Sequence, residues 1–211
     1  MKTITMISEN KKNKDRVSIF ADDEFLISCH KELIYKKSLR KGDKVDPDLL
    51  LELAREDEYM KAKDVALRSI ERSLKTVHEI EKKLRDKEYT EDTIQRVIQF
   101  MEEYRLIDDY KYAETFFKEK LRTRGVKKAR FELSNKGIPK DIMEKALDAL
   151  STSSVEEDSC LNLAEKKYAQ LVKRETDPYK LKNKLYTFLM GKGYDYELIS
   201  STLRKVMESS E

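Results

Sequence analysis

An internal repeat is the feature that most constrains what this chain can fold into. Each copy has a leucine, two further residues, a lysine, a turn residue and an apolar residue, followed by a helix start with an acidic first turn. The copies are Leu84–Ile94, Leu133–Ile142 and Leu189–Ile199, and their leucines stand 49 and 56 residues apart. This spacing leaves room for three helices in each unit, and three copies suffice for stacked units to bury a continuous core. The repeat therefore predicts a tandem array of three-helix units.

Composition and apolar spacing agree with this prediction. The 211 residues include only five glycines, three prolines and no tryptophan, and such a composition with abundant lysine, glutamate and leucine favours helices. Apolar residues at i, i+3, i+4 and i+7, such as Ile94, Val97, Ile98 and Met101, indicate buried helix faces. We predict a mainly α fold with three tandem three-helix repeats in an elongated, curved array. The repeats are expected at residues 59–107, 108–150 and 151–211, after a small β-strand and helix subdomain at residues 1–58.

The first fifty or so residues have a different pattern. Thr3–Ser8 and Arg16–Phe20 alternate apolar and polar residues, and Phe25–Ile27 follows an aspartate pair. These segments predict two or three short antiparallel strands. A short helix is expected at His30–Tyr35, and another is expected to begin at Pro47. A sheet this small requires a neighbouring helix for stability.

Capping signals mark several helix ends in the repeats. Asp108 can accept a hydrogen bond from the first turn of the helix that follows it, where the helix dipole also favours the Asp109 carboxylate. Thr76 and Glu79 have the spacing of a capping box. Residues 151–154, with the sequence Ser-Thr-Ser-Ser, are interpreted as a linker and hinge.

The turn residue of the repeat differs between units. Gly137 and Gly193 each follow the repeat's lysine directly, and we expect both to adopt positive φ at a helix C-terminus. Glu88 holds the same position in the first unit. Either Glu88 is strained there or its turn has another geometry.

Several classes of protein are disfavoured. Cys29 and Cys160 lie far apart without neighbouring ligands, which indicates reduced thiols and no zinc site. The chain shows no signal peptide and no long apolar run, so we expect a cytoplasmic protein without membrane contact. The only histidines are His30 and His78, and no phosphate-binding loop or nucleophile motif is present. We expect neither enzymatic activity nor a metal or other cofactor.

Positive charge is concentrated in one part of the chain. Tyr110–Leu150 holds eleven lysines and arginines against six acidic residues, and Gly125 divides the densest run between two helices. A second, smaller group of lysines follows in the third repeat. The candidate binding residues are Lys118, Lys120, Arg122, Arg124, Lys127, Lys128, Arg130, Lys180, Lys182, Lys184 and Lys192.

This charge has more than one interpretation. Most charge runs are simply solvated faces. If the two helix faces converge, they would bind phosphates without reading sequence, or they could contact an acidic protein surface. Arg124, Lys127 and Lys128 are expected to be exposed, whereas Phe117 and Phe131 are interpreted as core residues and not as base-stacking platforms.

Three stretches together resemble the RecX family of RecA recombinase regulators: Ala66–Leu84, Leu106–Ala113 and Gly125–Ile138. The resemblance extends over roughly Lys61–Val206, and the N-terminal strands resemble an extension of the Gram-positive members. One departure lies in the first repeat, where Lys87-Glu88-Tyr89 stands in place of the family's Lys-Gly-aromatic.

The resemblance implies a non-enzymatic regulator. Such a protein would bind the RecA nucleoprotein filament along its groove, inhibit its ATPase and strand exchange, and contact single- and double-stranded DNA nonspecifically. It would act as a cytoplasmic monomer in homologous recombination, DNA repair and the SOS response. The alternative is a nonspecific DNA-binding helical-repeat protein without a recombinase partner, and an enzyme is a distant third reading.

Overall fold

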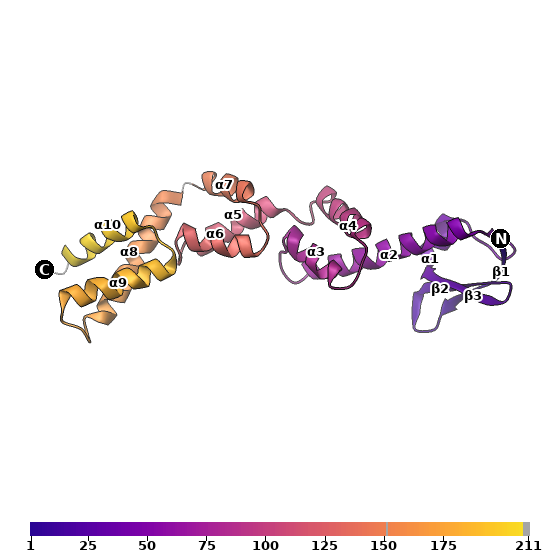
Figure 1. Ribbon diagram of the computed structural model, residues 1–211, viewed down its shortest axis with the longest axis horizontal. Helices are drawn as coiled ribbons and strands as arrows, with labels where there is room; N and C mark the ends of the chain where they lie inside the picture. Colours follow the sequence, from indigo (N-terminus) through magenta and orange to yellow (C-terminus); the bar gives the residue numbers. More distant parts are fainter. Residues whose placement is uncertain (151, 209–211) are drawn as a thin grey trace. The chain divides into compact units, whose positions relative to one another are not determined.

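The fold is seen in a computed structural model that describes residues 1–150 and 152–208, with the side chains of residues 152 and 153 excepted (Figure 1). The chain forms two compact units. One comprises Met1–Leu74 and Ile80–Leu106, and the other comprises Lys75–Glu79 and the chain from Ile107 onwards. The prediction of a mainly helical chain with a small N-terminal sheet is confirmed.

The N-terminal sheet is antiparallel and has the strand order β3-β2-β1-β4. Its alternating pattern places Ile4, Val17, Ile19 and Cys29 in a common core. Of the two or three strands predicted, three are present, and a two-residue strand too short to predict pairs with β1 at the edge of the sheet. The strands are β1 (Lys2–Asn10), β2 (Asn13–Ala21), β3 (Glu24–His30) and β4 (Lys44–Val45).

Two helices support this sheet. The short helix α1 (Lys31–Lys36) begins after His30, whose side chain accepts a hydrogen bond from the Glu32 backbone N–H. Helix α2 (Pro47–Ile70) runs unbroken from the sheet into the first helical repeat. The subdomain boundary expected after residue 58 therefore lies inside a helix, because no helix-breaking residue stands between Pro47 and Ile70.

The first repeat is completed by α3 (Val77–Arg85) and α4 (Glu91–Glu103), and α4 packs against α2. The predicted capping box is confirmed. The Thr76 N–H donates to Glu79 Oε2 at 3.1 Å, and the Glu79 N–H donates to Thr76 Oγ1 at 3.2 Å. The predicted apolar stripe is buried throughout, at Ile94, Val97, Ile98 and Met101.

The second and third repeats each have their own apolar core. Phe117 is fully buried, as predicted, but Phe131 is 66% exposed, so its assignment to the core is wrong. The predicted serine linker is also wrong: residue 151 lies outside the described residues, and Thr152 already begins a helix. The helices are α5 (Asp109–Lys120), α6 (Val126–Asn135), α7 (Lys140–Asp148), α8 (Thr152–Leu171), α9 (Pro178–Lys192) and α10 (Tyr196–Glu208).

The repeat's turn has one geometry in all three units. The residue at the turn has positive φ, at +62° for Glu88, +78° for Gly137 and +89° for Gly193. The next backbone N–H donates to the repeat's leucine carbonyl, as in Tyr89 to Leu84 at 3.3 Å and Ile138 to Leu133 at 3.1 Å. This is the Schellman closure of a helix. The expected positive φ of both glycines is confirmed, and Glu88 adopts the same left-handed conformation despite its side chain.

Replacing Glu88 by glycine is expected to stabilise the protein by about 1 kcal/mol, because glycine adopts positive φ without the steric cost that other residues have. The measurement is the thermal unfolding midpoint followed by circular dichroism. Lys87→Gly is the matched control: its backbone has no positive φ, so glycine there adds only flexibility and should lower the midpoint. An equal or lower midpoint for Glu88→Gly would contradict strain at Glu88.

Candidate functional site

The repeats of the second unit interlock through their closing turns. The turn that ends α6 contacts the start of α3, where Thr76 Oγ1 donates to the Lys136 carbonyl at 2.7 Å. Lys136 Nζ in turn pairs with Glu79 Oε1 at 2.7 Å. A Cβ at Gly137 would clash with the His78 side chain. Glycine is therefore required here by close approach as well as by backbone conformation.

The turn that ends α9 makes the corresponding contact with the start of α6. The Gly125 N–H donates to the Lys192 carbonyl at 3.0 Å, and Lys128 Nζ donates to the Gly191 carbonyl at 3.0 Å. A Cβ at Gly125 would clash with the Gly193 carbonyl, and one at Gly193 would clash with the backbone and side chain of Lys128. Backbones thus meet directly at this junction.

An acidic residue from the first helix of each later repeat reinforces these junctions. Asp109 Oδ1 accepts from the Val77 N–H at 3.0 Å, and Glu156 Oε1 accepts from the Val126 N–H at 2.8 Å. Each carboxylate thereby satisfies a free N–H at the start of the preceding repeat's second helix. Asp108 caps its own helix, as predicted, by accepting from the Lys111 N–H at 2.9 Å. No local sequence pattern predicts the partner of Asp109, because Val77 lies 32 residues away in the sequence.

Burial and hydrogen bonding shift the pKa values of the junction carboxylates Glu79 and Glu156 in opposite directions. Burial raises the pKa of Glu156, and the single hydrogen bond from Val126 only partly offsets it. Burial also acts to raise the pKa of Glu79, but hydrogen bonds from Lys136 and Thr76 outweigh burial and hold that pKa below its ordinary value. Glu79 is thus a stable anion within the junction.

Most of the predicted basic residues have partners within the chain. In the run from 118 to 130 the ion pairs are Lys118–Glu114, Lys120–Glu119, Arg124–Glu132 and Lys127–Asp195. In the third repeat they are Lys180–Asp177 and Lys184–Glu175, while Lys192 lies over the Phe188 ring. Exposed ion pairs contribute only about 0–1 kcal/mol, so these cations can exchange partners at little cost.

Not all of the predicted basic residues form ion pairs or lie on the open surface. Arg122 and Lys182 are exposed and have no ion pair among the residues that the structure describes. The expectation of simple exposure is wrong for Arg124 and Lys128. Arg124 is half-buried against Glu132, and Lys128 lies against the Gly193 turn. Lys128 takes part in the junction between repeats, whereas Arg124 pairs within its own repeat. The sequence alone predicts both side chains to be exposed.

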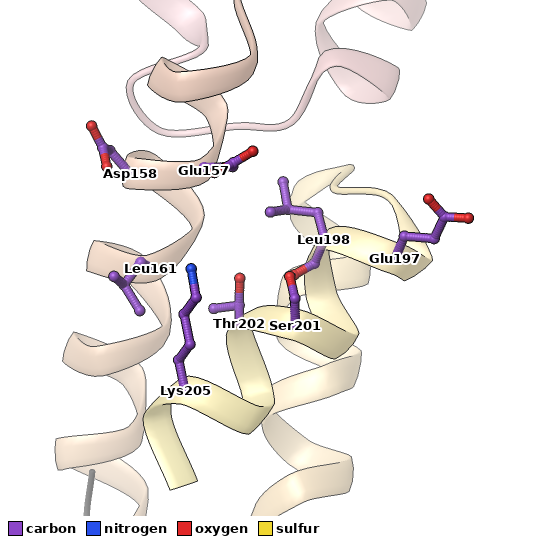
Figure 2. A pocket seen from close by; sticks show the side chains of 8 residues that line it. All are labelled: Glu157, Asp158, Leu161, Glu197, Leu198, Ser201, Thr202 and Lys205. Atoms are coloured by element: carbon purple, nitrogen blue, oxygen red, sulfur yellow. The ribbon is translucent and has the colours of Figure 1, made fainter. Parts of the chain in front are cut away.

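A groove of about 480 Å³ lies between α8 and α10 (Figure 2). Figure 2 shows acidic side chains at its upper end, with Lys205 extending along it from α10. The acidic residues are Glu157, Asp158 and Glu197. Such a rim repels phosphate, so this groove is not suited to nucleic acid. Over the described residues, no group of three or more His, Cys, Asp or Glu side chains could hold a metal ion.

Among the described helices, none has the length and apolar character needed to cross a membrane.

Four segments of the chain match the domains of one family. Residues 2–46 match the N-terminal domain of the regulatory protein RecX. Residues 62–101, 108–147 and 155–203 match the first, second and third three-helix domains of RecX.

Similar proteins cover nearly the whole chain. A regulatory protein RecX of Clostridium perfringens is 42% identical over 206 residues, which span 98% of this chain and 97% of that protein. A regulatory protein RecX of Clostridioides difficile is 34% identical over 216 residues, which span 100% of this chain and 99% of that protein.

Two crystal structures are similar as well. A regulatory protein RecX covers 99% of this chain and 100% of its own, with a TM-score of 0.76 and 22% identity, and so supports the fold. RecX from Lactobacillus salivarius has a TM-score of 0.65 and 30% identity, and covers 71% of this chain and 97% of its own. With three three-helix repeats, a small N-terminal sheet and matching domains along nearly its full length, this chain belongs to the RecX family of regulatory proteins.

Proposed function

We propose that this protein binds the RecA nucleoprotein filament, inhibits its ATPase and strand exchange, and contacts single- and double-stranded DNA without sequence preference. The observation that carries the proposal is family membership over all four domains. We further propose that it acts as a monomer in the cytoplasm, with domains near residues 1–58, 59–107, 108–150 and 151–211.

The charge distribution supports contact with DNA. The second repeat holds the excess of basic residues. Its exposed cations Lys118 and Arg122 lie four residues apart, near the end of α5 and in the turn that follows it. Cations on a surface bind phosphates by charge and release counterions, so the affinity falls with salt and does not depend on base sequence. The acidic groove between α8 and α10 is not suited to this contact.

Reversing the charge of Lys118 and Arg122 together is expected to weaken binding to single-stranded DNA and inhibition of the RecA ATPase. If both residues contact phosphates, the slope of log affinity against log salt should fall by about 1.4, at roughly 0.7 for each contact. The measurements are fluorescence anisotropy across a salt series and ATP hydrolysis on single-stranded DNA. Both side chains lie outside the repeat junctions, so the helical circular dichroism signal should be unchanged.

The matched control is Lys41→Glu with Lys87→Glu, which reverses two exposed charges in the first unit. If the Lys118/Arg122 variant bound DNA and inhibited the RecA ATPase as the wild type does, this basic surface would be merely solvated and would contact neither partner. Lost DNA binding with full inhibition would place the recombinase contact elsewhere. The alternative function, DNA binding without a recombinase partner, would be supported if the wild-type protein bound bare and RecA-coated DNA equally and left ATP hydrolysis unchanged.

A further inference from the structure

Phe131 is an aromatic residue at a position that faces solvent in every repeat. It stands two residues before the repeat's leucine, and the equivalent residues are Lys82 and Thr187, both exposed. The helical period explains this, since a residue two positions from the buried Ala129 and Leu133 points away from the core. Its ring is 66% exposed. The phenylalanine is therefore not part of the packing that builds the repeat.

The surroundings of Phe131 are basic and polar. Lys127 lies one turn before it and Asn135 one turn after it, and both are exposed. The single acidic residue of α6, Glu132, is engaged with Arg124. The Nε atom of the neighbouring Arg130 is shielded from solvent and has no hydrogen-bond partner among the described residues. The exposed face of α6 thus combines an aromatic ring with cations, and the one exposed carboxylate paired with these cations is Asp195, which contacts Lys127 from the third repeat.

Two other exposed aromatic residues have acidic neighbours, whereas Tyr35 and Tyr179 stand beside lysines outside the basic second repeat. Tyr104 is 67% exposed but follows Glu102 and Glu103, and Tyr196 is 64% exposed but precedes Glu197. Carboxylates beside those rings would repel the phosphates that accompany a base. The charge around Phe131 favours a polyanion that carries flat apolar groups, and single-stranded nucleic acid has this chemistry.

We propose that Phe131 is a stacking platform for a base of single-stranded DNA, with Lys127 and Arg130 placed to contact the adjoining phosphates. The proposal rests on the proposed contact with DNA and assigns a residue to it. In single-stranded DNA the faces of the bases are accessible, and stacking on an aromatic ring tolerates any sequence. In a duplex the faces are covered by neighbouring base pairs. Phe131 should therefore favour single-stranded over double-stranded DNA.

The first test replaces Phe131 by alanine in the full-length protein and measures binding to an oligothymidylate and to an abasic oligonucleotide of the same length. We expect affinity for the oligothymidylate to fall about 5- to 150-fold, since stacking contributes roughly 1–3 kcal/mol for each base. The slope of affinity against salt should not change, because no phosphate contact is removed. Binding to the abasic strand should be unaffected.

The second test uses the absence of tryptophan from the chain. Phe131→Trp introduces a single tryptophan, which can be excited selectively over the tyrosines and retains an aromatic ring for stacking. Affinity should be preserved, and the tryptophan fluorescence should be quenched when DNA binds. Tyr104→Trp is the matched control, because it replaces an exposed aromatic residue in acidic surroundings. Its fluorescence should not change on addition of DNA.

The outcomes separate this inference from the proposed function. Three results would each overturn the stacking role. The first is equal affinity of wild type and Phe131→Ala for the oligothymidylate, and the second is an equal loss of affinity for the abasic strand. The third is an unquenched tryptophan at position 131 in the DNA-bound state. Normal DNA binding with lost ATPase inhibition would overturn it too, by assigning Phe131 to the recombinase, and would leave the proposed function standing. Failure of the wild-type protein to bind any DNA would refute both the proposed DNA contact and the stacking platform.

Discussion

Replacing Asp57 by alanine is expected to destabilise the first unit by about 3–5 kcal/mol, the usual cost of leaving one member of a buried ion pair alone. The Asp57 side chain is 5% exposed and joins α2 to the sheet. Arg16 donates to both of its oxygens, at 2.9 and 3.0 Å, and the His30 N–H donates to it at 2.9 Å. Without the carboxylate, the largely buried Arg16 guanidinium keeps only the Ser28 carbonyl as an acceptor, and the His30 N–H loses its acceptor.

The measurement is urea-induced unfolding followed by circular dichroism. Asp64→Ala is the control, since Asp64 lies on the same helix with a side chain 65% exposed and pairs only loosely with Arg68, at 4.0 Å. Its loss should change stability by less than about 0.5 kcal/mol. Similar values for the two variants would show that the network around Asp57 contributes little to folding.

The same network predicts sensitivity to acid. Burial alone would raise the pKa of Asp57, but hydrogen bonds from Arg16 and Lys61 hold it below its ordinary value. A lowered pKa in the folded state means that this stability is fully present above the pKa of the unfolded chain, near 4, and is lost as pH falls through the folded pKa. Wild-type stability should therefore decline below about pH 4, and an Asp57→Asn variant should decline less steeply there.

Replacing Gly125 by alanine is expected to destabilise the second unit by about 3 kcal/mol, at the upper end of the usual cost of overpacking. The backbone at Gly125 has φ −76°, which alanine adopts freely, so the effect is steric. The added methyl group would meet the Gly193 carbonyl, which belongs to the backbone of a closed turn and cannot rotate away. The repeats would have to separate, or the turn after α9 would have to open.

Gly191 provides the matched control two residues before that turn. It lies within α9, and a Cβ there meets nothing within 4 Å. Gly191→Ala should be neutral or stabilise the protein by about 0.5–1 kcal/mol, because alanine is the better helix former. Both variants would be compared by chemical denaturation. Equal stability of the two would mean that the junction accommodates a side chain and that close backbone approach does not hold it together.

The junctions also explain why the repeats differ at their turns. Gly137 and Gly193 each lie against the second helix of the preceding repeat, at His78 and Lys128. Glu88 closes the first repeat, which has no preceding three-helix repeat. The backbone conformation favours glycine at all three positions, but close packing demands it only in the second and third repeats. Glu88 is thus tolerated at the cost of local strain alone.

The sequence by itself determined the local structure. Apolar spacing located the strands and the buried helix faces, and side chains such as Thr76, Glu79 and Asp108 marked helix starts, because caps and periodicity act between residues a few positions apart. The leucine–lysine turn motif determined the number of repeats. The resemblance to the RecX family could be seen in the sequence for the same reason, because the motifs that show it are made of neighbouring residues.

Only the tertiary structure decided which distant residues meet. Asp57 and Arg16 lie 41 residues apart, and Asp109 and Val77 lie 32 apart, so no local pattern connects them. The exposure of Phe131 was missed because an apolar residue in a helix is usually buried, and its outward direction follows only from the faces that α6 packs. The sequence also does not show which basic residues are engaged within the chain. The fold brings Glu132, Asp195 and the Gly191 carbonyl to Arg124, Lys127 and Lys128.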